Sequence, residues 1–159
     1  MTRAVSIMLA AIAVVPIAGC GDPVVNLPTP LIVINTSVNK GSHVKGLQPI
    51  IAFGFNKAVL FDSLRDTENY LLEALDEGRP EPPDLAARFP DEAGDRDAWT
   101  TIELTPVTDL AADTRYQLTL AAGGGGASGF EADDGSGLEE DYDFYFLTCP
   151  ADDPDCVPF

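Results

Sequence analysis

Apolar and polar residues alternate in several short runs between residues 31 and 148. Alternation at every second position predicts strands with one buried face and one exposed face. Such strands are expected over 51–55, 100–105, 116–120 and 142–146, and the β-branched run at 31–35 predicts another. Turn signals separate the runs at 39–42, 77–80 and 123–126. Because strong helix signals are few, we predict an all-β fold, an antiparallel sandwich.

Residues 67–78 fit two local structures. Leu71, Leu72 and Leu75 lie at helical spacing, Thr67 could cap a helix, and Gly78 could end it. A strand over residues 69–75 is the alternative. A single helical turn near residues 63–67 is compatible with both.

The stretch 77–97 is acidic, contains several prolines and has few apolar residues. It is longer than most connections between strands. We therefore expect an insertion that is largely irregular, with a helical turn over residues 83–89.

The first residues have the features of a targeting segment. Arg3 precedes an uncharged run from 4 to 18, which is shorter than the ~20 apolar residues that span a bilayer. The run ends in IAGC at 17–20, which resembles the lipobox of bacterial lipoprotein signal peptides. The resemblance implies a leader over 1–19, a lipidated Cys20, and a proline-containing tether over 20–30. An ordinary secretory signal with an incidental cysteine is the alternative.

Lipidation would hold the protein in the cell envelope through its N-terminus. Gly21 follows Cys20, and no aspartate stands at that position. In the sorting rule of many Gram-negative envelopes, this favours the outer membrane over the inner one.

Cys149 and Cys156 are the two remaining cysteines. In an oxidising compartment this even number fits a disulfide, and the turn-rich residues between them can reverse direction. We expect a disulfide-closed tail over 149–159. Two free thiols or a soft metal site are the alternatives.

Composition excludes several classes of protein. The formal net charge is −17, from 9 basic and 26 acidic residues, which is incompatible with a basic surface for nucleic acid. Hydrophobic residues make up 45% of the chain, too many for a disordered protein. A single histidine excludes a multi-histidine metal site.

Three segments together resemble bacterial Ig-like domains of the SbsA type. They are PIIAFGFNKAV at 49–59, TP with LAADTRYQL at 105–118, and GL with YDFYFLT at 137–148. The resemblance implies an Ig-like β-sandwich of about seven strands over 31–148, and it favours a strand over 69–75. Tyr116 lies where such folds place a tyrosine corner. The family carries no general catalytic residues.

Candidate catalytic residues are few. His43 lies in a turn-like stretch, and we expect a surface or loop histidine because no G-x-S-x-G motif accompanies it. Close carboxylate pairs are expected by chance among 26 acids. The glycines at 123–126 precede no Lys-Ser/Thr pair, so they form no P-loop and are expected in a flexible hairpin connection. Trp99 is expected at the core or its rim.

An acidic loop offers a weak calcium candidate. Asp133, Asp134, Glu139 and Asp141 surround the glycines at 135 and 137, and calcium prefers oxygen ligands on a sharply turning loop. The spacing lacks the register of an EF-hand. A soluble acidic loop is the alternative.

The sequence thus predicts a non-enzymatic, lipid-anchored envelope protein that presents one Ig-like domain. Its role would be structural, adhesive, or the binding of a protein or glycan, with no cofactor and no nucleic acid. A calcium-dependent binding module and an accessory part of an extracytoplasmic hydrolase are the alternatives.

Overall fold

A computed structural model describes residues 29–90, 98–124, 126, 128–150, 152–154 and 156. The lipobox with Cys20, the leader, most of the tether and residues 91–97 lie outside the described residues. The strands are β1 (Val33–Thr36), β2 (His43–Lys45), β3 (Ile51–Leu60), β4 (Tyr70–Ala74), β5 (Leu85–Arg88), β6 (Ala98–Pro106), β7 (Arg115–Leu120) and β8 (Tyr142–Cys149). Two short helical segments, α1 (Phe61–Arg65) and a 3-10 helix (Thr67–Asn69), join β3 to β4.

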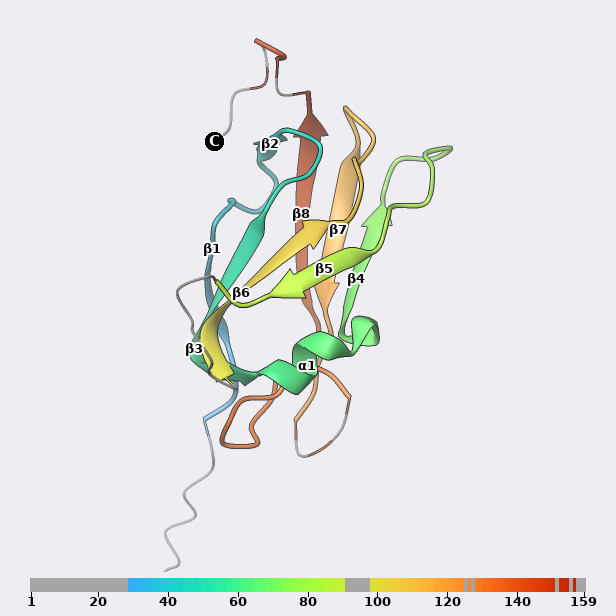
Figure 1. The fold of residues 1–159 in the computed structure, drawn as a ribbon. Helices are drawn as coiled ribbons and strands as arrows, with labels where there is room; N and C mark the ends of the chain where they lie inside the picture. Colours follow the sequence, from blue (N-terminus) through green and yellow to red (C-terminus); the bar gives the residue numbers. More distant parts are fainter. Residues whose placement is uncertain are drawn as a thin grey trace, which may run out of the picture.

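The strands form two four-stranded sheets (Figure 1). One sheet has the order β1-β3-β6-β5 and the other β2-β8-β7-β4. Neighbouring strands are antiparallel except β2, which runs parallel to β8. Without β2, the seven other strands correspond in chain order to strands A to G of an Ig sandwich. The first sheet then has the spatial order A-B-E-D, and β4, β7 and β8 are strands C, F and G. The predicted all-β sandwich is confirmed, with β2 as an additional edge strand.

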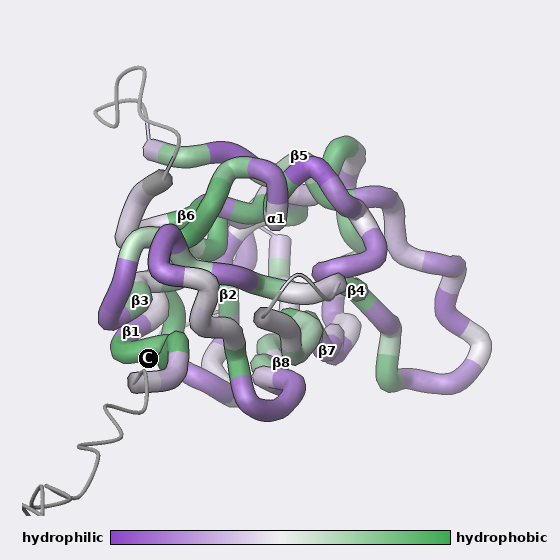
Figure 2. The backbone as a smooth tube through the Cα atoms, turned by 90° about the horizontal axis from the view of Figure 1, so that it is seen from below, coloured by the Kyte–Doolittle hydropathy of each residue, from purple (hydrophilic) through white to green (hydrophobic). Residues whose placement is uncertain are grey.

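Aromatic side chains fill the space between the sheets. Phe53 of β3 meets Phe144 of β8 edge to face, with ring centroids 5.7 Å apart. Phe55 stacks on Phe130 from the 121–141 connection at 6.0 Å. Seen from below, the two sheets form two layers, and hydrophobic stretches occur in the strands of both (Figure 2). These aromatic residues are almost completely buried, so each sheet covers the apolar face of the other.

The ambiguous segment at 67–78 contains a strand, as the resemblance favours. In β4, Tyr70 and Leu72 are buried, whereas Leu71 is 54% exposed. The leucines at 71 and 72 therefore lie on opposite faces of a strand, and their helical spacing does not reflect one apolar face. The expected helical turn nearby is present as α1 and the 3-10 helix.

The expectation for residues 83–89 is wrong. This part of the acidic insertion contains β5 instead of a helical turn, and β5 pairs antiparallel with β6. Arg88 of β5 forms an ion pair with Glu103 of β6 at 2.9 Å. The edge of β6 supplies backbone partners that residues 85–88 cannot find locally, which overrides their weak local preference.

His43 is only partly buried, at the edge of a sheet. It begins β2 and pairs with Leu147 of β8, so it lies on an edge strand instead of in a loop. The parallel register continues to Lys45 opposite Cys149. Short edge strands of this kind carry little sequence signal.

The connection 121–141 is built by close backbone packing. A Cβ atom on Gly137 would lie 1.6 Å from the carbonyl oxygen of Gly123, and one on Gly129 would lie 1.9 Å from that of Ala122. Bridges tie the same connection to the domain, joining Leu138 to Leu31 and Ala132 to Val59. These glycines are required because no side chain fits between the backbones.

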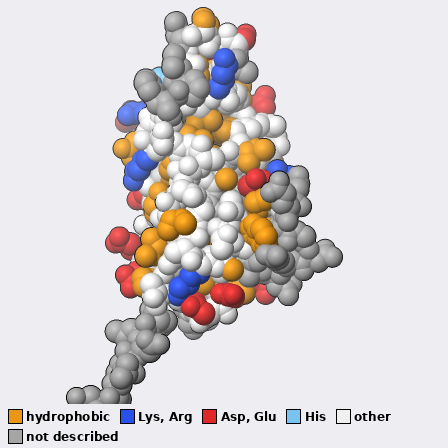
Figure 3. All heavy atoms as spheres, turned by 90° about the vertical axis from the view of Figure 1, so that its left-hand side faces the viewer, with side chains coloured by type: hydrophobic (Ala, Val, Ile, Leu, Met, Phe, Trp, Pro, Cys, Tyr) orange, Lys and Arg blue, Asp and Glu red, His pale blue; other side chains and the backbone are white. Residues whose placement is uncertain are grey.

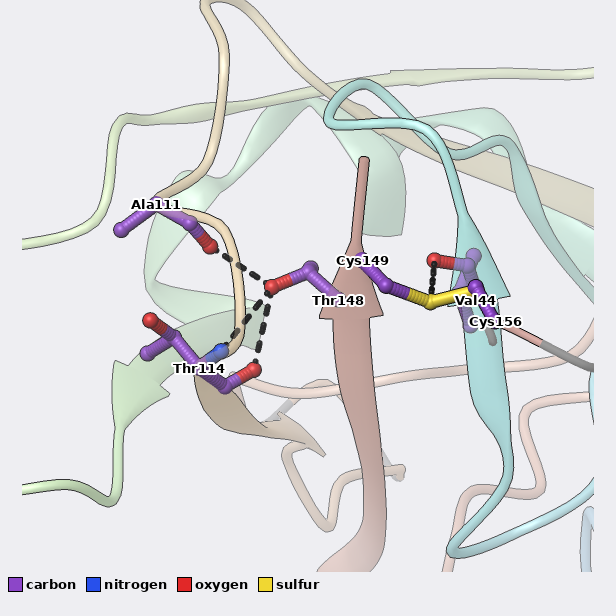
Figure 4. Close-up of a disulfide and its surroundings, with 6 residues drawn as sticks. All are labelled: Val44, Ala111, Thr114, Thr148, Cys149 and Cys156. Carbon is purple, nitrogen blue, oxygen red and sulfur yellow. Dashed lines mark hydrogen bonds between the residues drawn. A yellow bond between two sulfur atoms is a disulfide. The ribbon is translucent and has the colours of Figure 1, made fainter. Parts of the chain in front are cut away.

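The turn between β6 and β7 has the geometry of a tyrosine corner. The hydroxyl oxygen of Tyr116 accepts a hydrogen bond of 2.9 Å from the backbone N–H of Ala111. Next to it, the Thr148 hydroxyl lies 2.6 Å from the carbonyl oxygen of Ala111 and accepts from the N–H of Thr114 at 3.3 Å (Figure 4). The corner is thereby attached to the end of β8.

Replacing Tyr116 with phenylalanine tests this corner. The Tyr116→Phe variant keeps the ring and its stacking on Phe146 but leaves the Ala111 N–H without its acceptor. We expect the free energy of unfolding to fall by about 1–2 kcal/mol in chemical denaturation. Tyr145→Phe, at a tyrosine that is 45% exposed, should change it by less than about 0.5 kcal/mol. Equal effects would contradict the role of the hydroxyl.

A second prediction separates close packing from backbone strain. Gly137→Ala places a methyl group against the backbone of residue 123 and should lower the free energy of unfolding by about 3 kcal/mol. Gly78 has a φ of 75° but open space around it, so Gly78→Ala should cost only about 1 kcal/mol. Thermal and chemical unfolding compare the two variants. A smaller loss for Gly137→Ala than for Gly78→Ala would contradict the packing described above.

Candidate functional site

The described chain enters the sandwich at one end, beside the connections 61–69 and 121–141 (Figure 1). Leu31 forms a parallel bridge with Leu138, and its N–H donates to the carbonyl oxygen of Gly137 at 3.0 Å. The opposite end carries the 75–84 and 107–114 connections and the C-terminal tail. The entering chain and the C-terminal tail therefore lie at opposite ends of the sandwich.

A partly exposed ion pair ties the entering chain to the 121–141 connection. Lys57 Nζ lies 2.7 Å from a carboxylate oxygen of Asp134 and 2.9 Å from the hydroxyl of Ser136, and it also donates to the carbonyl oxygen of Thr29. The Lys57 ammonium, followed by the hydroxyl and N–H of Ser136, holds the pKa of the Asp134 carboxyl well below its usual range. Asp134 thus acts as a partner for a lysine within the fold.

The calcium candidates do not converge. Asp134 is occupied by Lys57, and Asp141 accepts a hydrogen bond of 2.7 Å from the N–H of Ala122. Asp133 and Glu139 are exposed. Among the residues that the structure describes, no three His, Cys, Asp or Glu side chains are grouped so as to hold a metal ion. The calcium hypothesis gains no support from this geometry.

The expected disulfide between Cys149 and Cys156 is present (Figure 4). Cys149 ends β8 and its carbonyl oxygen accepts from the N–H of Gly46 at 2.9 Å, while its sulfur lies 3.7 Å from the carbonyl oxygen of Val44. Both cysteines are buried. The bond holds the tail against β2 at the end of the sandwich opposite to the entering chain.

A hollow surface follows the outer edge of β4, and no pattern in the sequence predicts it. A hollow of about 410 Å³ lies between residues 71–74 of β4 and residues 76–82 of the next connection. A smaller hollow of about 180 Å³ adjoins it, between residues 67–72 and 81–85. Leu71, Leu72, Glu81 and Pro82 line both. We call the two hollows together the β4 groove; its larger part has the volume of an ordinary ligand pocket.

Carboxylates dominate the charge of the β4 groove. Its charged lining residues are Arg79 and five acids, Glu73, Asp76, Glu77, Glu81 and Asp84. Arg79 donates to the carbonyl oxygen of Asp113 at 3.1 Å. Asp76 accepts from the N–H and the guanidinium of Arg115, which holds the pKa of its carboxyl below the usual range. The other four acids form no such ion pair in the described residues, so the β4 groove is negative.

An exposed apolar surface lies on the β1 side of the first sheet. Ile32, Ile34 and Ile50 are 47%, 62% and 50% exposed, and hydrophobic side chains are visible on this side of the molecule (Figure 3). A bulge between Val33 and Asn35 interrupts the ladder of β1 with β3. A hollow of about 200 Å³ adjoins Ile32 and is lined by residues 30–32 and 138–142.

Comparison with known proteins adds little about function. No protein family matches the chain, and no curated protein matches it. Among solved structures, it is similar to the crystal structure of CopC from Methylosinus trichosporium OB3b. That likeness has a TM-score of 0.45 and 12% sequence identity, and it covers 77% of this chain and 97% of that chain. Within the described residues, no helix is long and apolar enough to cross a membrane.

Removal of Lys57 tests its role beside Asp134. In Lys57→Met, the pKa of the Asp134 carboxyl should rise toward the ordinary value of about 3.9. The pKa of this carboxyl is lower in the folded state than in the unfolded state, so its ionisation stabilises the fold at pH values above the unfolded-state pKa. This stabilisation is lost as the pH falls through the folded-state pKa. The variant should lose this stabilisation at neutral pH. Carbon-13 NMR titration of the carboxyl group measures the shift.

Lys45→Met, at an exposed lysine of β2, is the matched control and should leave the Asp134 titration unchanged. An unchanged Asp134 titration in Lys57→Met would show that the ion pair does not set this pKa.

Proposed function

We propose that the protein is a non-enzymatic, lipid-anchored cell-envelope protein whose single Ig-like domain binds another macromolecule of the envelope. The anchor is Cys20, in the IAGC sequence at 17–20. The outer membrane is its expected location because Gly21 follows the cysteine. The observation that carries the proposal is the combination of this motif with one β-sandwich that begins shortly after it.

The position of the entering chain supports tethered presentation. Residues 29–31 join the sandwich at the end that carries the 121–141 connection, and Lys57 and Gly137 fix them there. A lipid on Cys20 would keep this end toward the membrane. The opposite end, with the 75–84 connection and the disulfide-held tail, would then face away from it.

The charge of the protein supports the same orientation. Its formal net charge of −17 opposes contact with an anionic membrane surface. An acidic domain attached through its N-terminus is repelled from such a surface, which keeps its distal loops and sheet edges accessible. The β4 groove extends toward the distal end and is the hollowed surface that this arrangement exposes.

Exchange of the anchoring cysteine tests the proposal. Wild-type protein should appear in the membrane fraction, with an intact mass that begins at Cys20 and includes acyl chains. Cys20→Ser should abolish the acyl mass and release most of the protein, because the described domain has no membrane-spanning helix.

Cys149→Ser with Cys156→Ser is the matched control for cysteine loss. It removes the disulfide but should leave the membrane fraction unchanged. A Cys20→Ser protein that stays in the membrane fraction, or a wild-type protein without acyl mass, would overturn the proposed anchor.

A further inference from the structure

We infer that the β4 groove binds an extended, cationic peptide segment of a partner protein, which adds as a fifth strand to the free edge of β4. The inference deepens the proposed binding role and rests on it, but it does not depend on the lipid anchor.

The backbone of β4 presents free hydrogen-bonding groups at this edge. The N–H of Leu75 donates to Arg115 and the carbonyl oxygen of Asn69 accepts from Ala121, which places the odd-numbered residues in hydrogen-bonded pairs with β7. In an antiparallel ladder such pairs alternate. The N–H and C=O groups of Leu72 and Ala74 therefore point away from β7, and no backbone hydrogen bond in the described residues satisfies them from that side.

The other sheet edges are less suited to a further strand. β4 has five residues, whereas β1 and β5 have four and β2 has three. The ladder of β1 is interrupted by its bulge, and bulges oppose edge pairing. At β5, Phe89 at its end contacts Phe61 of α1, with ring centroids 5.5 Å apart. The β4 edge combines a regular ladder with a hollow beside it.

The side chains around the edge specify the chemistry of the peptide. Leu71 on the outer face of β4 is 54% exposed and Leu75, directly after the strand, is 45% exposed, which offers contacts to apolar side chains of an added strand. The unpaired acids of the β4 groove attract lysine and arginine. Peptides that add to a sheet edge gain affinity from the main chain and specificity from alternate side chains. An alternation of basic and apolar residues satisfies both requirements.

A second copy of this chain is a poorer occupant. Pairing two β4 edges would bring two acidic grooves together on two chains whose formal net charge is −17 each. Like charges directly opposite one another destabilise a strand pair. The charge of the β4 groove thus selects a partner of opposite charge over self-association.

A defined peptide tests the inference on the mature, full-length protein in detergent. The probe is a capped ten-residue peptide that alternates lysine and valine, and titration calorimetry measures its affinity. We expect it to bind at least tenfold more tightly than the same peptide with glutamate in place of lysine. N-methylation of alternate residues keeps the charge but removes strand hydrogen bonds, and it should weaken binding at least tenfold.

Charge reversal locates the site. Glu73→Lys with Glu81→Lys should weaken binding of the lysine peptide at least tenfold, because both exposed acids line the β4 groove. Glu139→Lys with Glu140→Lys changes the net charge equally at exposed positions of the 121–141 connection, and it should alter the affinity less than threefold.

Amide hydrogen exchange provides a readout specific for strand addition. The N–H groups of Leu72 and Ala74 should exchange at least tenfold more slowly when the lysine peptide is bound. The N–H groups of Leu71 and Glu73 already point to β7 and should change little. Binding that is unaffected by N-methylation, or that leaves residues 72 and 74 unprotected, would overturn the inference.

The two proposals fail separately. If the lysine peptide does not bind while Cys20→Ser still releases the protein from the membrane, peptide addition to β4 is wrong and the anchored module stands. If Cys20→Ser remains in the membrane fraction, the proposed anchor is wrong whatever the peptide does. A glycan that binds equally well to the Glu73→Lys/Glu81→Lys variant would place the partner site elsewhere and count against the β4 groove.

Discussion

The contact of Phe53 with Phe144 across the two sheets is the interaction on which the rest of the structure depends. Phe53 comes from β3 and Phe144 from β8, the inner strands of the two sheets, and Tyr142 meets Phe53 from the same side at 6.2 Å. Burying these rings removes a large apolar area from water, and the strands that carry them must then find backbone partners on both sides. The pairing of β3 with β1 and β6, and of β8 with β2 and β7, satisfies this requirement.

A sandwich built in this way leaves edges that are not equivalent. β2 is held at its edge by the disulfide-linked tail, and β1 is bulged and close to the entering chain. β4 keeps a regular ladder, and the backbone N–H and C=O groups of Leu72 and Ala74 point away from it. An acidic connection forms the far wall of the hollow beside this edge. The domain therefore has one end suited to attachment and one edge suited to recognition, and the carboxylates around that edge select the charge of a partner.

The sequence predicted the architecture better than it predicted the surface. Alternation identified the inner strands, since Phe53, Tyr116 and Phe144 lie on the buried face of their strands. That face is set by the local pattern and does not depend on which strand pairs beside it. It missed β2 and β5, which have three and four residues and gain their order from the edges of β8 and β6. The acidic residues near 133–141 suggested a metal ligand set, but Lys57 lies far away in the sequence and occupies Asp134.

By itself, the sequence determined the β class of the fold, the faces of its inner strands, the pairing of two cysteines and the motif around Cys20. These features depend on neighbours within a few residues, or on a count. The tertiary structure alone decided that residues 85–88 form a strand, that Lys57 neutralises Asp134, and that β4 is left as an open edge. A strand is an edge when no other strand pairs with one of its two sides, and this depends on the positions of distant segments. Local patterns encode how a segment buries one face, and they do not encode which backbone will lie next to it.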